Sequence, residues 1–279
     1  MKMTINRLIL FIISIVSIAG MAFLTSCGGS DTVQNLSAME RFQLGEKKYN
    51  EGNYLDAVSD FNIVKLQFSG SNVADSAQYY LAECHYKREE YILAGEEYQA
   101  LKRAYPSSPL VAISQYKTGL CYYMLSPKPL LDQKYTVRAI DEFQTFLEYY
   151  PTNELVKDAA DKIQELNNRL AQKDFETAQL YMKLEYYKSA VYYFNSVFEK
   201  YHDTQYGEPA LLGKIRALIA RKHYQEAKPD VEKFLDRYPN SQYKGDAESM
   251  RKDIEDHLKS KSAASPSTNT GDHGVTGGS

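Results

Sequence analysis

A regular spacing of alanines and aromatic residues constrains this chain more than any other feature of its 279 residues. Five segments align without a gap, and each has an alanine followed by an aromatic residue 11 positions later. The pairs are Ala57 and Phe68, Ala94 and Tyr105, Ala139 and Tyr150, Ala190 and Tyr201, and Ala227 and Tyr238. Successive alanines are 37, 45, 51 and 37 residues apart, so one unit recurs with two insertions. This period is typical of chains that stack small helical units into a continuous core.

Each aligned segment has the periodicity of an α-helix. An aromatic residue lies three positions before the alanine in four of the five segments, and an aromatic residue or a valine lies four positions after it. These spacings place side chains on one face of a helix. Pro106, Pro151 and Pro239 directly follow the last aromatic residue of three segments, and proline disfavours helical geometry in the residue before it. The pattern therefore predicts five helices, three of which end just before a proline.

A second helix precedes each of these five, and a small residue marks its position. In three repeats the small residue lies nine positions before the aromatic residue that opens the aligned segment: Gly45, Ala82 and Ala178. The third repeat has Gly119, but an insertion at residues 126–133 moves its second helix away. The fifth repeat has Ile215 at the small position, which leaves open how its two helices cross.

These features together resemble the tetratricopeptide repeat, in which a small residue of the first helix packs against the second. We therefore expect an all-α fold, an α-solenoid of about five tetratricopeptide-like helix pairs with a C-terminal capping helix. The solenoid is placed at residues 37–260, with repeats near 37–71, 73–108, 110–151, 170–205 and 208–241 and the cap at 243–260. Residues 153–183 lack proline and glycine, which predicts one long helix, and residues 261–279 are expected to be a disordered tail.

The N-terminus has the pattern of a bacterial export signal over residues 1–26, with Lys2 and Arg7 ahead of an apolar run. The run ends in Leu-Thr-Ser-Cys, which resembles a lipobox whose cysteine, Cys27, is acylated and becomes the new N-terminus. Two or more acyl chains give stable membrane attachment, and residues 27–36 then form a lipidated tether. A retained membrane anchor is the alternative, although the run is short and interrupted for a spanning helix.

Composition excludes several classes of function. The formal net charge of −3 becomes −5 without residues 1–26, so charge does not recruit nucleic acid. No metal-ligand spacing, phosphate-binding loop or nucleophile motif is present, so we expect no metal, no cofactor and no enzymatic activity. Cys84 and Cys121 occupy equivalent repeat positions and are expected to be small buried residues rather than a disulfide.

An aromatic stripe is the one candidate binding feature. Two rings flank the small residue in each of the first three repeats, and the six candidates are Phe42, Tyr49, Tyr79, Tyr86, Tyr116 and Tyr123. If these rings line the concave face of the solenoid, they form a groove that grips an extended peptide. The alternative is that they pack the repeats against one another, because the stripe includes the position where helices approach most closely.

The order of these elements resembles the BamD family of outer-membrane assembly lipoproteins. The lipobox leads directly into five repeats, the third repeat has its loop insertion, and "NNRLAQKDFETAQLY" stands in the long helix ahead of the fourth repeat. The resemblance covers about residues 27–260. It implies a non-enzymatic subunit of the β-barrel assembly machinery, anchored by lipid to the periplasmic face of the outer membrane. Its implied partners are unfolded outer-membrane proteins at the N-terminal repeats and the periplasmic domains of the barrel-forming protein at the C-terminal repeats.

Two other functions stay open from the sequence. A periplasmic tetratricopeptide scaffold of another kind, such as a division coordinator, has similar repeats but usually brings a coiled-coil N-terminus. An accessory role that presents a partner hydrolase is also compatible with the repeats. A co-purified catalytic subunit distinguishes this second alternative.

Overall fold

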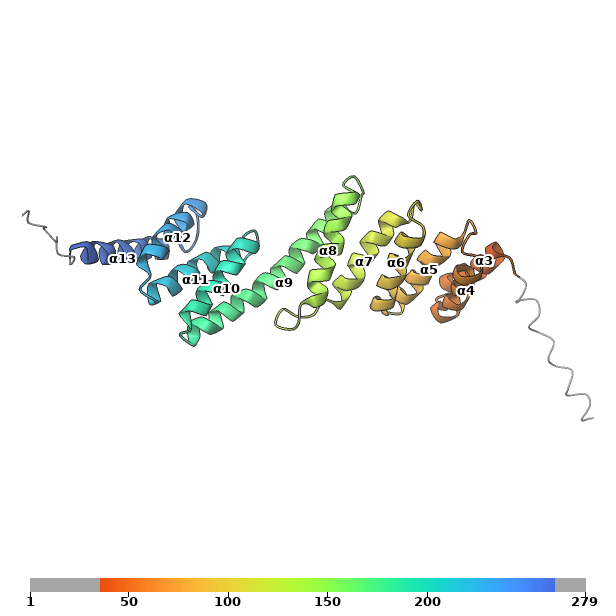
Figure 1. Cartoon of the computed structure of the whole chain (residues 1–279), viewed down its shortest axis with the longest axis horizontal. Coiled ribbons are helices and arrows are strands. Elements are labelled where there is room, and N and C mark those ends of the chain that lie inside the picture. Colours follow the sequence, from red (N-terminus) through yellow and green to blue (C-terminus); the bar gives the residue numbers. More distant parts are fainter. Residues whose placement is uncertain (1–35, 264–279) are drawn as a thin grey trace, which may run out of the picture. The chain divides into compact units, whose positions relative to one another are not determined.

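The computed structural model describes residues 36–263, and in this range the chain forms eleven helices and no strand (Figure 1). The helices are α3 (Ala38–Asn50), α4 (Tyr54–Gln67), α5 (Ala74–Lys87), α6 (Tyr91–Ala104), α7 (Val111–Leu125), α8 (Lys134–Tyr149), α9 (Val156–Lys183), α10 (Tyr187–Lys200), α11 (Gly207–Ala220), α12 (Tyr224–Arg237) and α13 (Lys244–Ala263). Cys27 and the other residues of the lipobox lie outside the described range, as do residues 264–279.

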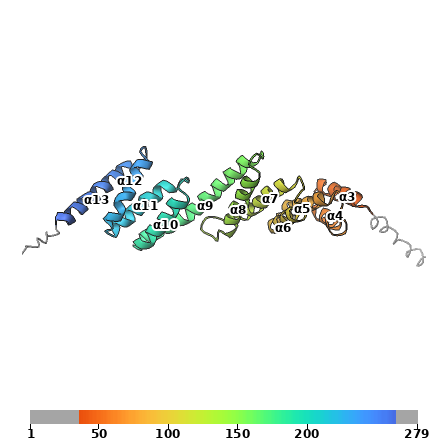
Figure 2. The same ribbon diagram turned by 45° about the horizontal axis from the view of Figure 1, so that its top comes forward.

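The helices follow one another as five antiparallel pairs and a final helix, which confirms the predicted all-α solenoid of helix pairs with a capping helix. The chain divides into two compact units, residues 1–114 and 115–279, and the division falls within α7. Within each unit, consecutive helices lie against each other (Figures 1 and 2). Helices α6, α8 and α12 end just before Pro106, Pro151 and Pro239, as predicted.

In the first and third pairs, a glycine of the first helix faces an aromatic ring of the second. A Cβ atom on Gly45 would come within 2.9 Å of the Phe61 ring, and one on Gly119 within 2.8 Å of the Phe143 ring. These separations are too short for any side chain, so only glycine lets the helices approach this closely. The Gly119 contact also shows that α8 packs on α7. The insertion therefore lengthens the connection between the two helices without separating them in space.

The fifth pair reaches the same packing with the bulk exchanged between helices. Ile215 stands at the small position, and the residue that faces it in sequence register is Val231, where the other pairs have an aromatic ring. Both residues are fully buried in one apolar cluster that also holds Phe234 and Ile254. A larger residue on α11 is therefore matched by a smaller one on α12, which answers the question that the sequence left open.

A polar contact recurs beside this apolar crossing. It joins the residue four positions before the small residue to the residue just before the facing aromatic ring. Gln78 Nε2 donates to the Glu97 backbone carbonyl at 3.1 Å, and Gln115 Nε2 donates to the Glu142 carbonyl at 2.8 Å. In the first pair the equivalent Arg41 is buried and pairs with Asp60 at 3.0 Å. Buried polar groups need such partners, so these contacts fix the register of the first three pairs.

The turn between the two helices of a pair also repeats. Gly52, Glu89, Glu185 and Lys222 have φ angles of 81°, 61°, 60° and 61°, and each lies two positions before the aromatic residue that opens the second helix. A left-handed residue at this point ends the first helix and directs the chain into the second. Glycine adopts this conformation freely, whereas other residues strain, yet only the first turn uses glycine.

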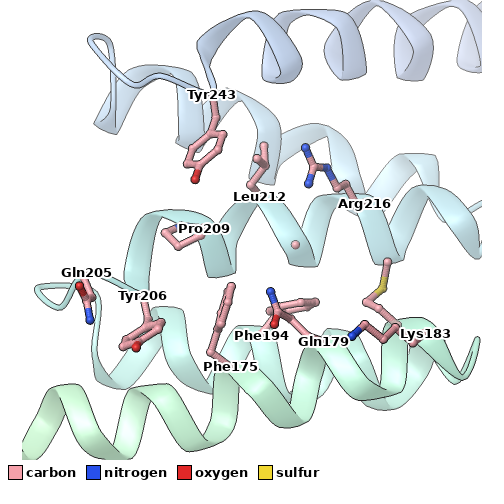
Figure 3. Close-up of a pocket in the computed structure, with 12 residues that line it drawn as sticks. Phe175, Gln179, Lys183, Phe194, Gln205, Tyr206, Pro209, Leu212, Arg216 and Tyr243 are labelled. Atoms are coloured by element: carbon pink, nitrogen blue, oxygen red, sulfur yellow. The ribbon is translucent and has the colours of Figure 1, made fainter.

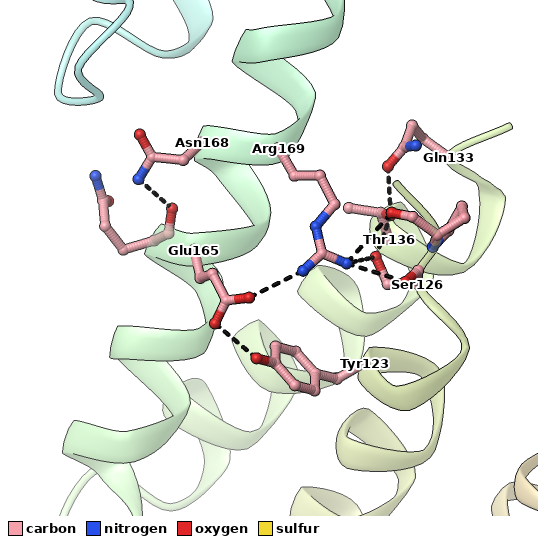
Figure 4. Close-up of polar contacts among 9 residues, drawn as sticks. Tyr123, Ser126, Gln133, Thr136, Glu165, Asn168 and Arg169 are labelled. Atoms are coloured by element: carbon pink, nitrogen blue, oxygen red, sulfur yellow. Dashed lines mark hydrogen bonds and ion pairs between the residues drawn. The ribbon is translucent and has the colours of Figure 1, made fainter. Parts of the chain in front are cut away.

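The insertion of repeat three is held against α9. Arg169 Nη1 donates to the Ser126 carbonyl at 3.0 Å and to the Ser126 hydroxyl at 2.7 Å, while Arg169 Nη2 pairs with Glu165 at 2.9 Å (Figure 4). Four residues further along α9, Lys173 Nζ donates to the Leu131 carbonyl at 2.8 Å. The 28-residue α9 confirms the predicted long helix, and it supplies the surface on which the inserted loop rests.

Candidate interaction surfaces

The first two aromatic candidates lie in the N-terminal unit and pack within its first two helix pairs. The Phe42 ring is 5.7 Å from the Phe61 ring and 5.8 Å from the Tyr80 ring, measured between centroids. The Tyr49 ring is 5.2 Å from the same Tyr80 ring and 5.4 Å from Tyr54. Both candidates are half-buried. Tyr80, which the sequence did not single out, is the residue around which they gather.

Tyr79 and Tyr86 lie on α5 of the same unit. The Tyr79 ring is 5.8 Å from Tyr98, and the Tyr86 ring is 5.4 Å from Tyr91. Burial raises the pKa of the Tyr79 phenol, and the neighbouring Glu83 carboxylate raises this pKa further. Both rings therefore belong to helix-pair packing, and Tyr79 keeps its proton throughout the physiological pH range.

Tyr116 and Tyr123 lie on α7 and belong to the C-terminal unit. Tyr116 is buried, its ring is 5.6 Å from Phe146, and its hydroxyl donates to Asp158. The Tyr123 hydroxyl donates to Glu165 at 2.6 Å (Figure 4). Burial and the Glu165 carboxylate raise the pKa of Tyr123 to about 12.

All six rings thus contact other residues of their own unit, and five of them keep part of their surface exposed. Packing and ligand contact are compatible for those five, because a half-buried ring can present one edge to solvent. Tyr116 presents almost no surface. The assignment of the six rings to a peptide groove stays a prediction.

A hollow of about 720 Å³ opens in the C-terminal unit (Figure 3). The first helices of the fourth and fifth pairs form its two walls: Phe175, Gln179, Met182 and Lys183 of α9, and Pro209, Leu212, Gly213 and Arg216 of α11. Spacings of three, four, seven and eight residues put each set on one helix face. Phe194 of α10, the loop residues Gln205 and Tyr206, and Tyr243 ahead of α13 complete the lining. We call this hollow the α9–α11 groove.

The α9–α11 groove has an apolar floor and a basic end. The Phe175 ring lies 5.6 Å from Phe194 and 5.4 Å from Tyr206; Phe175 and Tyr206 are half-buried, and Phe194 is buried at 3% exposure. Lys183 and Arg216 are the only charged residues in the lining. Arg216 is about half exposed and pairs with Asp246 at 2.7 Å. In Figure 3 Tyr206 and Lys183 lie at opposite ends of the groove.

Gly213 is the residue that keeps the groove open. A Cβ atom at this position would come within 2.7 Å of the Phe194 ring, so any side chain here would press on the floor. Gly213 lies two positions before Ile215, and the equivalent residue two positions before Ala82 is Tyr80. The Tyr80 ring stacks on Phe61 at 5.5 Å. The sequence contained this signal, but the repeat pattern directed attention to Ile215 and not to the glycine before it.

None of the helices in residues 36–263 is long and apolar enough to cross a membrane. Within the same range, no three His, Cys, Asp or Glu side chains come together as metal ligands would. Cys84 and Cys121 are both buried and form no disulfide with each other, as expected, and burial raises the pKa of the Cys84 thiol to about 12.

Residues 34–222 match the family described as YfiO, outer membrane lipoprotein. This range is more than half of the chain. The chain belongs to the YfiO family, which is also the BamD family. The matched range of the YfiO family contains every residue of the α9–α11 groove except Tyr243, whereas Cys27 precedes it.

Solved structures of tetratricopeptide proteins resemble this YfiO-family chain. The TPR2AB domain of yeast Sti1, in a complex with pHSP90, is 17% identical over 81% of this chain and 86% of its own, with a TM-score of 0.42. A tetratricopeptide repeat protein from Parabacteroides merdae is 14% identical over 81% and 75%, with a TM-score of 0.35. TTC0263 from Thermus thermophilus is 15% identical over 80% and 100%, with a TM-score of 0.33. The search of curated proteins found no match.

Proposed function

We propose that this chain is a non-enzymatic subunit of the β-barrel assembly machinery, held at the periplasmic face of the outer membrane by lipid on Cys27. In this role it binds unfolded segments of outer-membrane proteins and docks the barrel-forming subunit for membrane insertion. Membership of a family of outer membrane lipoproteins carries the proposal. A fold built from helix pairs, typical of scaffolds that act by binding, also supports it.

The two binding roles are assigned to different surfaces. The client segments are assigned to the aromatic stripe, of which Phe42, Tyr49, Tyr79 and Tyr86 belong to the N-terminal unit and Tyr116 and Tyr123 to the C-terminal unit. The barrel-forming subunit is assigned to the surface of repeats four and five and α13, which includes the α9–α11 groove. This division lets one chain hold a client while it stays attached to the machinery.

Binding of clients must be transient for the cycle to proceed. An unfolded β-strand presents alternating side chains, and exposed ring edges can contact these without forming a sheet. The client then passes to the barrel-forming subunit, so its affinity has to stay modest. A micromolar dissociation constant corresponds to about −8 kcal/mol.

The first experiment asks whether the chain belongs to the machinery. A tagged full-length chain is purified from gently solubilised outer membrane, and the proteins that accompany it are identified. A β-barrel assembly protein is expected to co-purify. Recovery of a cell-division protein or of a hydrolase in its place would instead support one of the two alternative scaffolds.

The second experiment tests the anchor. Cys27→Ala removes the acylation site, so the chain is expected to leave the membrane fraction. The control is Cys84→Ala, because Cys84 is buried far along the sequence in α5 and takes no acyl chain. A Cys27→Ala chain that still resists carbonate extraction contradicts lipid anchoring.

The third experiment tests the aromatic stripe. Binding of a C-terminal peptide of an outer-membrane protein is measured by fluorescence anisotropy, together with thermal unfolding of each variant. Tyr86→Ala and Tyr123→Ala are expected to weaken binding, because both rings keep exposed surface. If both variants lose stability but bind with unchanged affinity, the rings serve only to pack the helices.

A further inference from the structure

We propose that the α9–α11 groove binds an extended segment of a partner protein that carries an apolar side chain and, three or four residues away, an acidic side chain. This rests on the scaffold function proposed above and names the chemistry of one docking segment for repeats four and five. The inference stands on the shape of the groove, its charge and the distance between its two ends.

The apolar side chain is accommodated at the aromatic end. Phe175 and Tyr206 are half-buried and offer exposed ring surface there, whereas Phe194, at 3% exposure, supports Phe175 from within and packs directly against Gly213. A hollow of about 720 Å³ is within the usual range for ligand sites, which is about 300–1,000 Å³. An aromatic or large aliphatic side chain that enters this end removes apolar surface of both partners from water.

The acidic side chain is accommodated at the basic end. Lys183 and Arg216 supply the only charges of the lining, and both are positive. Lys183 has no ion-pair partner among residues 36–263, while Arg216 is half exposed and pairs with Asp246. The lining itself contains no acid, and because Asp246 already neutralises Arg216, Lys183 supplies the main attraction for an incoming carboxylate.

The spacing follows from the geometry of α9. Phe175 and Lys183 are eight residues apart, which corresponds to about 12 Å along a helix. An extended chain advances about 3.3 Å per residue, so it covers that distance in three to four residues. The groove thus selects for the separation of the two side chains as well as for their chemistry.

The equivalent place in the N-terminal unit shows what a closed groove looks like. Tyr80 occupies the position of Gly213, stacks on Phe61 and contacts Phe42. Glu46 and Glu83 stand where the C-terminal unit has Gln179 and Arg216. The open and basic character of the α9–α11 groove is therefore specific to the later repeats and is not a general property of the fold.

The chain's own tail is a poor occupant. Residues 264–279 offer one valine as their only large apolar side chain and contain no aromatic residue. A valine leaves most of the aromatic end unfilled. A partner segment with a phenylalanine or leucine matches the floor better, and we commit to that occupant.

The experiment uses the full chain carrying Cys27→Ala, so that no lipid is present. A fluorescein-labelled, C-terminally amidated peptide carries Phe and Asp four positions apart in a Gly/Ser background, and anisotropy gives the dissociation constant. We expect saturable binding that weakens at least threefold when NaCl rises from 50 to 300 mM. Peptides with Phe→Ala or Asp→Asn are expected to bind at least tenfold more weakly.

Four protein variants locate the site. Lys183→Glu and Gly213→Tyr are expected to reduce affinity at least tenfold, and Arg216→Gln at least threefold. Lys157→Glu is the matched control, because Lys157 is an exposed lysine of the same helix outside the groove, and its affinity should not change. Circular dichroism identifies a Gly213→Tyr chain that fails to fold, and the two charge variants then decide the question.

Several outcomes would overturn the proposal. Equal loss of binding in Lys157→Glu and Lys183→Glu shows general charge attraction. Recovery of the Asp→Asn peptide by a free C-terminal carboxylate shows capture of a chain terminus, and gain of binding on deletion of residues 264–279 shows that the tail occupies the groove. The purified chain is assayed alone, so a negative result leaves the co-purification test of the scaffold function intact.

Discussion

Repeats two and five build the same helix pair, yet they differ at one position that decides what surface each offers. In repeat two, Tyr80 covers the Phe61 ring of the preceding pair, with the two rings stacked at 5.5 Å. In repeat five, Gly213 leaves the corresponding Phe194 ring at the floor of a groove. The repeat pattern thus determines where the helices lie. The residue two positions before the small position, Tyr80 or Gly213, decides whether a hollow remains between neighbouring pairs.

The charged residues around Tyr80 also differ from those around Gly213. The N-terminal unit has Glu46 and Glu83 next to Tyr80, and burial, followed by the charge of Glu46 and its hydrogen bond with Tyr80, raises the pKa of that phenol. The C-terminal unit has Gln179 and Arg216 at the equivalent positions. One surface is filled and acidic, and the other is open and basic.

The largest expected effect is a loss of stability, which is compared between the Phe61→Ala and Phe194→Ala variants. Phe61 is enclosed on all sides, so its loss should destabilise the N-terminal unit by about 3–5 kcal/mol. Phe194 is 3% exposed but lines the groove, so its loss leaves a cavity that opens to solvent and should cost about 1–2 kcal/mol less. Urea denaturation with hydrogen exchange assigns the loss to each unit. Equal costs in the two units would mean that the groove is closed in solution.

Exchanging the sizes of Ile215 and Val231 tests whether the helix crossing of repeat five packs like that of the other repeats. Ile215→Ala should destabilise by about 2–4 kcal/mol through a cavity, and Val231→Phe by about 1–3 kcal/mol through overpacking. Because the double variant recreates the small–aromatic pairing of repeats one and four, it should recover at least half of the summed loss. A double-mutant cycle measured by chemical denaturation gives the coupling. Purely additive losses would show that the two residues do not pack on each other.

The inserted loop, found only in the third repeat, gives a local effect. Arg169→Ala removes the donors that hold Ser126, so stability should fall by about 1–3 kcal/mol. Chymotrypsin should then cut faster after Leu131, which is exposed and lies inside the loop. Cleavage kinetics followed by mass spectrometry measure this, and Lys157→Ala serves as the control. An unchanged cutting rate contradicts the brace on α9.

The smallest effect is a pH dependence confined to the N-terminal unit. Hydrogen bonds from Arg88, and then from His85, lower the pKa of Glu90 to about 2 from its ordinary value of 4.5. The charged form is favoured in the folded state, so its contribution is complete above about pH 4.5 and is lost as the pH falls toward 2. Denaturation curves across this range should show a steeper loss in the native chain than in Glu90→Gln. Parallel curves would show that Glu90 does not contribute to the pH dependence of stability.

The helix pairs could be predicted because their signals are local. The spacing of Ala57 and Phe68, and the proline after Tyr105, each act within a single helix or its end. The groove depends on contacts between consecutive pairs, which a repeat alignment does not weigh. The role of Gly213 depends on its contact with the Phe194 ring, which only the three-dimensional structure shows.

The recurring polar contacts could not be predicted from the sequence for a different reason. Arg41, Gln78 and Gln115 occupy one repeat position but differ in residue type, so a search for identical residues passes over them. What they share is a donor that reaches the second helix of the pair. The aromatic stripe was visible in the sequence, but the burial of Tyr116 and the central place of Tyr80 required the three-dimensional arrangement.

The left-handed turns have a consequence for engineering. Three of the four turns that share this geometry place Glu or Lys where glycine would relax the backbone. Such a residue typically costs about 1 kcal/mol relative to a strain-free one, part of which the greater freedom of unfolded glycine cancels. Glycine at Glu89, Glu185 or Lys222 should therefore raise the thermostability of the unit that contains it, and none of these three residues lines either interaction surface.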